Sequence, residues 1–200
     1  DEKYVDGKNV FYGDSLNSFS KYKFVCTNPP YLHKNKADKK TKNRFFTGIH
    51  SYFEDLYQVS IFSILHCEDG ILIVPLNFLS AENSQKVRDL FFDKFEIIRL
   101  NIFSGQVFDD TTYNVIAFYF RKKNANCEKN KISAVIFPQK QNIDFVIEKR
   151  YHWQLGGDFI QRVKKTQNHL GIARLTEDDM QLGVHPVEIA FQNIKDKKYL

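Results

Sequence analysis

The tetrapeptide Asn28-Pro29-Pro30-Tyr31 follows the short apolar run Lys23-Phe24-Val25-Cys26-Thr27. An apolar run of this length that stops at two prolines indicates a buried strand ending abruptly in a loop. Proline has no N–H group and a fixed φ, so Pro29 and Pro30 stiffen the backbone and leave its carbonyl oxygens able to accept hydrogen bonds. We therefore expect a rigid corner at the carboxyl end of a strand, where open α/β sheets bind ligands.

The side chains at this corner suit a planar base that carries an exocyclic amine. Asn28 supplies a carbonyl acceptor and an NH2 donor, and Tyr31 supplies a flat ring for stacking. A Pro-Pro turn with an Asn cap would have the same four residues, so the tetrapeptide leaves both interpretations open.

Periodicity on both sides of the corner predicts an α/β sheet. A short strand over 9–12 comes first. A helix over 49–67 follows later and is terminated by Glu68-Asp69-Gly70, in which Gly70 is suited to a left-handed C-cap. The continuous apolar run Ile71–Val74 is typical of a buried parallel strand. A helix over 81–94 and strands over 95–103 and 113–120 follow. This alternation, closed by two consecutive strands, predicts an α/β sheet with an antiparallel final strand.

The remainder of the chain has a different character. We expect two further strands over 131–137 and 145–147, a loop at Gly156-Gly157 and a helix over 159–165. The pattern becomes irregular at about 150–168, so we divide the chain into residues 1–150 and a C-terminal extension, residues 151–200.

Composition limits the functional classes. The 200 residues are 42% hydrophobic, and no apolar run is long enough to span a bilayer, so we expect one soluble domain and no membrane partner. Three cysteines without CxxC spacing and six histidines without paired-ligand spacing indicate neither a disulfide framework nor a metal site, and a reducing cytoplasm is the expected compartment. The chain begins at Asp1 rather than Met, which suggests a piece of a longer protein.

The net charge of +5 is unevenly distributed. Basic residues crowd the segment after Tyr31, namely Lys34, Lys36, Lys39, Lys40, Lys42 and Arg44. Such a run is typical of a solvated, mobile loop, and it also fits a polyanion such as DNA or RNA. A loop that orders on phosphates satisfies both interpretations.

Several motifs resemble one known family. Gly13-Asp14-Ser15-Leu16, the Asn28–Tyr31 corner, Gly70–Pro75 and Val107-Phe108 occur in the order found in S-adenosylmethionine-dependent N6-adenine DNA methyltransferases of bacterial restriction–modification systems. The resemblance covers about residues 9–120. It implies part of a Rossmann-like class I methyltransferase sheet, with residues 1–150 as the catalytic part. Residues 151–200 would then be a linker and the start of a target-recognition domain.

The resemblance also implies roles for individual residues. Asp14, with Ser15 and Leu16, would bind the cofactor adenine, and Asn28 would border both cofactor and substrate. Asn28 and the Pro29 carbonyl, stiffened by Pro30, would accept hydrogen bonds from the target adenine N6, and Tyr31 would stack on the extruded base. Phe108 would be a second aromatic against the base. Lys34 and Lys36 are expected to contact double-stranded DNA because they belong to the basic run beside this pocket. Thr111, Thr112 and Tyr113 share the Phe108 loop, and the sequence does not decide whether they line the pocket.

The resemblance breaks where the family's first two strands and Gly-rich loop would lie before residue 1. We therefore expect this chain alone to bind S-adenosylmethionine weakly, to methylate nothing measurable, and to be able to dimerise through an exposed strand edge. Three alternatives stay open: a release-factor glutamine methyltransferase, which also uses Asn-Pro-Pro-Tyr, an RNA adenine methyltransferase, and a non-catalytic nucleic-acid-binding fragment.

Overall fold

The computed structural model describes residues 22–109 and 114–164, the single residues Val5, Gly7, Gly13 and Leu16, and the pairs 188–189 and 198–199. The chain divides into two compact units, Asp1–Asp158 and Phe159–Leu200. In the second unit, β7 (Glu188–Ile189) pairs with β8 (Lys198–Tyr199) in antiparallel orientation. The predicted strand over 9–12 lies outside the described residues.

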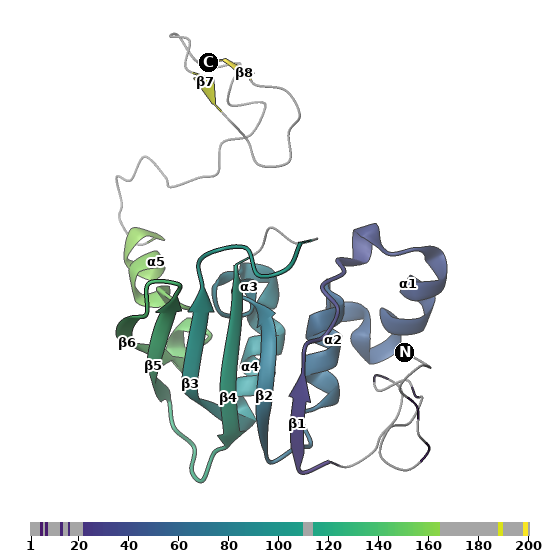
Figure 1. The fold of residues 1–200 in the computed structure, drawn as a ribbon, viewed down its shortest axis with the longest axis horizontal. Helices are drawn as coiled ribbons and strands as arrows, with labels where there is room; N and C mark the ends of the chain where they lie inside the picture. The colour runs from purple at the N-terminus through teal and green to yellow at the C-terminus, as the bar shows by residue number, and fades with distance from the viewer. Residues whose placement is uncertain are drawn as a thin grey trace. The chain divides into compact units, whose positions relative to one another are not determined.

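A six-stranded sheet forms the first unit, with strand order β1-β2-β4-β3-β5-β6 (Figure 1). Its strands are β1 (Phe24–Thr27), β2 (Asp69–Pro75), β3 (Phe95–Phe103), β4 (Val115–Lys122), β5 (Lys129–Phe137) and β6 (Gln141–Glu148). The pairings β1–β2 and β3–β5 are parallel, whereas β4 is antiparallel to both β2 and β3 and β6 is antiparallel to β5. The sheet confirms the predicted α/β class and the predicted antiparallel strand, which is β4 and lies between β2 and β3.

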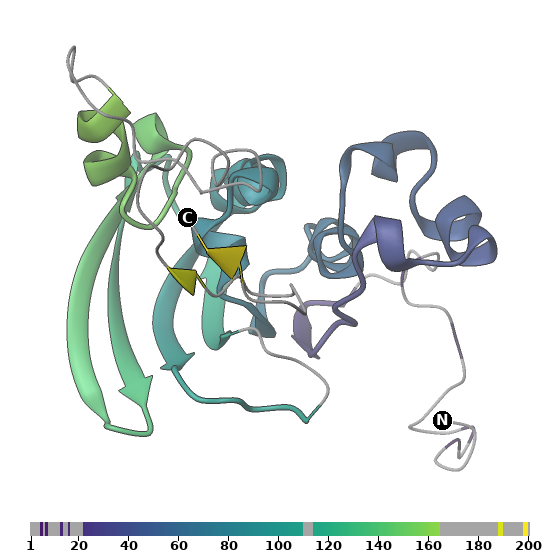
Figure 2. The same cartoon turned by 90° about the horizontal axis from the view of Figure 1, so that it is seen from above.

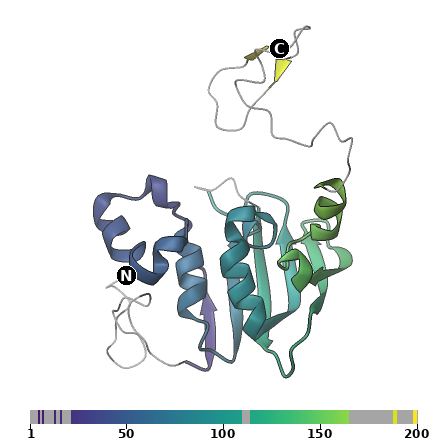
Figure 3. The same ribbon diagram turned by 180° about the vertical axis from the view of Figure 1, so that it is seen from behind.

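Helices cover one face of this sheet, as Figures 2 and 3 show for α2 and α4. The helical segments between β1 and β3 are η2 (Lys34–Lys36), α1 (Lys39–Phe45), η3 (Gly48–Tyr52), α2 (Leu56–Ser63), α3 (Asn77–Ser80), η4 (Glu82–Ser84) and α4 (Gln85–Lys94). After β6 come η5 (Lys149–Tyr151) and α5 (Gly157–Lys164). None of the described helices has the length and apolar character needed to cross a bilayer.

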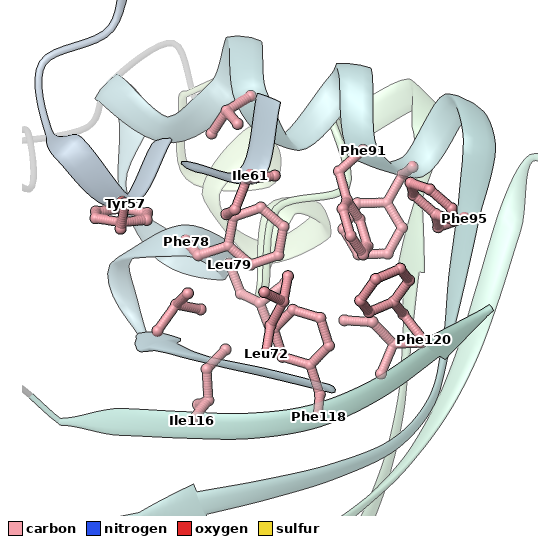
Figure 4. Packing of buried hydrophobic residues seen from close by; sticks show 14 of the residues in the cluster. Tyr57, Ile61, Leu72, Phe78, Leu79, Phe91, Phe95, Ile116, Phe118 and Phe120 are labelled. Atoms are coloured by element: carbon pink, nitrogen blue, oxygen red, sulfur yellow. The ribbon is translucent and has the colours of Figure 1, made fainter. Parts of the chain in front are cut away.

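Phenylalanine rings fill the space between the helices and the sheet (Figure 4). The Phe91 ring of α4 lies 5.4 Å from Phe78 and 5.2 Å from Phe120 of β4, measured between centroids, and all three side chains are fully buried. Edge-to-face pairs at these separations stabilise a core beyond their buried area. The helical layer therefore holds β2 and β4 in fixed positions.

The segment after β6 returns to this layer. The buried Arg88 guanidinium donates hydrogen bonds to the carbonyl oxygens of His152 (2.7 Å) and Ala81 (2.8 Å), and the Trp153 ring stacks on Phe92 at 5.2 Å. Residues 151–158 accordingly belong to the first compact unit. The predicted helix over 159–165 is present as α5, which begins at Gly157. The predicted loop at Gly156-Gly157 is therefore confined to Gly156, which lies in a turn with a φ of 71°.

The predicted single helix over 49–67 is also wrong, because a helix N-cap interrupts it. η3 ends before Phe53, whose backbone is extended, and α2 begins after Asp55. Asp55 and Gln58 form a reciprocal capping box, in which Gln58 Oε1 accepts from the Asp55 N–H at 3.3 Å. Each N-terminal donor satisfied in this way favours starting the helix at residue 56.

The lysine-rich segment is helical rather than the expected loop. α1 begins after Asp38, whose Oδ1 accepts a hydrogen bond from the Thr41 N–H at 2.7 Å. An aspartate in this position satisfies an otherwise unpaired donor and opposes the positive end of the helix dipole. Lys42 and Arg44 in the last turn complement the negative end.

Gly70 has a different role from the predicted C-cap. It lies within β2, buried, where it pairs with Val25 of β1. A Cβ at this position would collide with the Val25 backbone oxygen and lie 2.6 Å from Val25 Cγ1. Glycine therefore allows β1 to approach β2 closely.

We predict that Gly70→Ala destabilises the fold by about 1–3 kcal/mol, because the added methyl group meets backbone that can move only if β1 separates from β2. Urea denaturation measures the loss. Gly105→Ala is the matched control, since no atom lies within 4 Å of the Cβ there. Equal stability of the two variants would contradict the proposed close contact.

Candidate active site

The predicted corner stands at the carboxyl edge of the sheet. The last residue of β1, Thr27, pairs with Leu72 of the parallel strand β2, which continues to Pro75, so Asn28 leaves the sheet next to the carboxyl-terminal half of β2. Asn28 is exposed and Pro29 is buried. The buried proline anchors the corner while the asparagine amide faces solvent. Among the described residues, no hydrogen bond is made to the Pro29 carbonyl oxygen.

The Tyr31 hydroxyl joins this corner to β2. It lies 2.8 Å from Asn28 Oδ1 and 3.1 Å from the Ile73 carbonyl oxygen. A hydroxyl group has one proton, so it donates fully to only one of these two acceptors at a time. If the Asn28 amide were rotated by half a turn, its Nδ2 would donate to the Tyr31 hydroxyl oxygen and the hydroxyl would donate to the Ile73 carbonyl. The amide, the hydroxyl and the carbonyl would then all be paired. The Asn28 carbonyl oxygen would then face away from Tyr31.

Burial keeps this hydroxyl protonated. Desolvation of the half-buried side chain raises the pKa of Tyr31 from 10.0 to about 12. Tyr31 is therefore a neutral hydrogen-bond donor at every pH at which the protein would act, and it holds the asparagine amide without a charge of its own.

Three aromatic rings gather at the corner. The Tyr31 ring centroid lies 6.3 Å from that of Phe108 and 6.5 Å from that of Tyr57, both in edge-to-face geometry. Gln106 Nε2 donates to the Phe108 carbonyl at 3.0 Å and to the Asp109 carbonyl at 3.1 Å, and these bonds constrain the turn around Phe108 in the described part of the β3–β4 loop. The structure thus brings together the two aromatic residues, Tyr31 and Phe108, that the sequence motifs identified.

Tyr57 and the Ile73 carbonyl contact Tyr31, and the sequence motifs did not indicate either group as part of the candidate site. Tyr57 is buried in the first turn of α2, and its hydroxyl lies 2.7 Å from Ser84 Oγ. Its signal in the sequence is the Asp55–Gln58 capping box, which sets the start of α2 and so directs Tyr57 toward Tyr31.

The other predicted site residues are only partly within the described structure. Lys34 and Lys36 lie in η2, three and five residues beyond the corner's Tyr31, and Lys36 is exposed. Leu16 is partly buried against the core. Asp14, Ser15 and Thr111, Thr112 and Tyr113 lie outside the described residues. In the described part of the chain, no group of three or more His, Cys, Asp or Glu side chains could hold a metal ion.

The described residues form a mixed α/β sheet with an acceptor-rich Asn-Pro-Pro-Tyr corner at its carboxyl edge. The model of the Eco57I restriction-modification methylase family matches residues 1–108, which is more than half of the chain. The chain therefore belongs to the Eco57I restriction-modification methylase family. No curated protein matches it.

Solved structures give similarity at low identity. The modification subunit of a putative type I restriction enzyme from Vibrio vulnificus YJ016 is 12% identical, with a TM-score of 0.44 over 59% of this chain and 26% of that chain. The EcoKI M protein is 18% identical, with a TM-score of 0.46 over 62% of this chain and 28% of that chain. A type I methyltransferase subunit from Streptococcus thermophilus is 14% identical, with a TM-score of 0.42 over 78% of this chain and 36% of that chain. This chain thus spans about a quarter to a third of the proteins it matches.

We predict that Tyr31 ionises near pH 12 rather than near 10.0. Because its pKa is raised in the folded state, the stability it contributes is complete below pH 10.0 and is lost as the pH rises toward 12. The phenolate absorbance of the wild type minus that of Tyr31→Phe gives the titration of this one side chain. A midpoint near 10.0 in the folded protein would contradict the burial of the hydroxyl.

Proposed function

We propose that the full-length protein transfers a methyl group from S-adenosylmethionine to the N6 amine of an adenine in double-stranded DNA, within a restriction–modification system in the cytoplasm. The observation that carries this proposal is the corner itself: an exposed Asn28 amide, with the rings of Tyr31 and Phe108 beside it at the carboxyl edge of the sheet. Membership of the Eco57I family supports a methyl transfer reaction that acts on DNA.

The acceptors at the corner would prepare the amine for reaction. The lone pair of adenine N6 is delocalised into the ring, so the nitrogen is a weak nucleophile. Asn28 Oδ1 and the Pro29 carbonyl would each accept one N6 hydrogen and hold both N–H bonds out of the plane that conjugation prefers. Preorganised dipoles of this kind stabilise the transition state because they need no reorganisation during the reaction. The methylated nitrogen is cationic and readily loses its proton.

Tyr31 would orient the Asn28 amide in this step. With the hydroxyl donating to the Ile73 carbonyl and Asn28 Nδ2 donating to the hydroxyl oxygen, the asparagine carbonyl is directed to the substrate. Exchange between this arrangement and the one in which Oδ1 accepts from Tyr31 needs only rotation of the amide. The Tyr31 hydroxyl would thereby donate to Asn28 Oδ1 until the N6 amine of an adenine takes its place as donor.

The described residues fit one side of the cofactor site. Asn28 is exposed at the carboxyl edge of β1, where a bound cofactor would lie beside the target base, and Leu16 packs against the same core. S-adenosylmethionine, when bound, supplies a methyl group activated by a sulfonium. Asp14 and Ser15 would hold its adenine, and Asn28 would lie between cofactor and substrate.

The aromatic rings at the corner would hold the adenine outside the helix. A base inside a duplex cannot be reached, so the enzyme must offset a few kcal/mol of unstacking. Tyr31 would contact the extruded base on its face and Phe108 along its edge. The basic segment after Tyr31 favours a nucleic acid over the glutamine side chain of a release factor, which the tetrapeptide would equally accept.

We predict that Asn28→Ala in the full-length protein lowers methyl transfer to DNA at least 100-fold, a loss of about 10²–10³ being typical when one preorganised hydrogen-bonding group is removed. DNA binding should be retained, because Asn28 holds one amine and no phosphate. Transfer of radiolabelled methyl groups to genomic DNA measures the activity, and a filter-binding assay measures affinity.

Asn142→Ala is the matched control, since Asn142 is an exposed asparagine on β6 at the other side of the sheet. It should leave both measurements unchanged. Unchanged methylation by Asn28→Ala would instead favour a non-catalytic binding module, and methylation of RNA or of a glutamine-containing peptide in preference to DNA would favour the corresponding alternative.

A further inference from the structure

Residues 32–55, between the corner and α2, form a segment that is closed at its base and that we call the insert. His33 and Asp55 form an isolated antiparallel bridge, flanked by hydrogen bonds from Lys34 N to the Glu54 carbonyl (2.7 Å) and from Leu56 N to the Leu32 carbonyl (3.1 Å). Tyr31 and Tyr57, whose rings touch, lie immediately outside this closure. The two ends of the insert are therefore fixed directly beside the proposed target-base site.

A cavity of 430 Å³ lies just inside this closure. It is lined by His33, Lys34 and Asn35 from one end of the insert and by Ser51, Tyr52, Phe53 and Glu54 from the other. Its volume falls within the range of small-ligand sites. It combines an ammonium group, an amide, a carboxylate and an aromatic ring, which together match the phosphate, the base edge and the base face of a nucleotide.

Tyr52 is held in place although its ring is largely exposed. The side chain has 66% of its surface accessible, and the Lys86 ammonium of α4 lies 3.2 Å from the ring centroid. A cation over one face fixes the ring and leaves a flat apolar surface for another partner. Ile49, on the same 3-10 helix, is 62% exposed, so this part of the insert presents apolar surface within a basic segment.

The insert also contains the excess positive charge of the chain. Residues 34–52 carry six basic residues and one acidic residue, a net charge of +5, which equals that of all 200 residues. Within the described structure, no carboxylate lies within ion-pair distance of the five lysines, Lys34, Lys36, Lys39, Lys40 and Lys42. Lys34 Nζ instead donates to the Ser51 carbonyl at 3.3 Å, which places it at the cavity. Lys34, the lysine that lines the cavity, therefore has no carboxylate partner within ion-pair distance among the described residues, which favours an anionic ligand there.

We propose that this cavity binds a nucleotide of the DNA strand that flanks the target adenine, with Tyr52 stacked on its base and Lys34 on its phosphate. The inference rests on the proposed function, because it takes the target base to lie at Tyr31. Successive bases stack about 3.4 Å apart along a strand, and the cavity lining starts only two residues beyond Tyr31. A base on each side of the His33–Asp55 bridge would hold the strand open around the extruded adenine.

Fluorescence anisotropy with a labelled single-stranded oligonucleotide tests this proposal in the full-length protein. We expect Tyr52→Ala to weaken binding about 5- to 100-fold, in line with the loss of one base–aromatic stack, without changing its dependence on salt. Lys34→Gln should reduce the slope of log K against log salt by about one, because one phosphate contact is lost. Tyr52→Phe should bind like the wild type, since the ring is kept.

Tyr22→Ala is the matched control, because Tyr22 is 59% exposed and precedes the opposite, amino end of β1. It should change the affinity less than twofold, and thermal unfolding should show that all variants fold. Free dAMP has the same base and phosphate without the rest of the strand. If dAMP displaces the oligonucleotide only at millimolar concentration, the assignment of the cavity to a DNA strand is supported. Tight dAMP binding without oligonucleotide binding would contradict it.

Equal losses from Tyr52→Ala and Tyr22→Ala, or none from Tyr52→Ala, would also overturn the proposal. The assay involves no methyl transfer, so its outcome is separate from that of the Asn28→Ala experiment. If the protein is inactive as a methyltransferase but needs Tyr52 to bind DNA, the proposed nucleotide site stands although the proposed function fails. If the protein is active but binds DNA equally well without Tyr52, only the proposed nucleotide site fails.

Discussion

The candidate site depends on the parallel pairing of β1 with β2. Both strands end at the same edge of the sheet, and Gly70 removes the side chain that would keep them apart. The Tyr31 hydroxyl then reaches from the corner to the Ile73 carbonyl of β2. A tetrapeptide on an independent loop would sample many orientations. Here the buried Pro29, the strand pairing and one hydroxyl group fix the Asn28 amide at the edge of the sheet.

The same corner also sets the position of the basic insert. The polypeptide leaves Tyr31, forms η2, α1 and η3, and returns through the His33–Asp55 bridge to α2. The Asp38 cap starts the lysine-rich helix α1, and the Asp55 cap starts α2 where the insert returns to the corner. A positively charged element therefore lies where a DNA strand would approach the proposed target-base site.

Continuous apolar runs made the strands predictable, and β3 occupies the residues 95–103 that the sequence indicated. The helices between β1 and β2 were less predictable, because side-chain caps at Asp38 and Asp55 outweighed periodicity and charge. The motif order identified Tyr31 and Phe108, which the fold brings to 6.3 Å from each other. The Ile73 carbonyl and Tyr57 belong to none of these motifs. Their contact with Tyr31 depends on the β1–β2 register and on the start of α2, which the Asp55–Gln58 capping box sets.

We propose that the Asn28–Tyr31 corner holds adenine N6 for methyl transfer. The most direct measurement is mass spectrometry of nucleosides from the DNA of cells that express the full-length protein in a host without its own DNA methylation. We expect N6-methyladenine and no methylated cytosine. Methylated cytosine alone, or DNA without methylation from an expressed and folded full-length protein, would contradict this proposal.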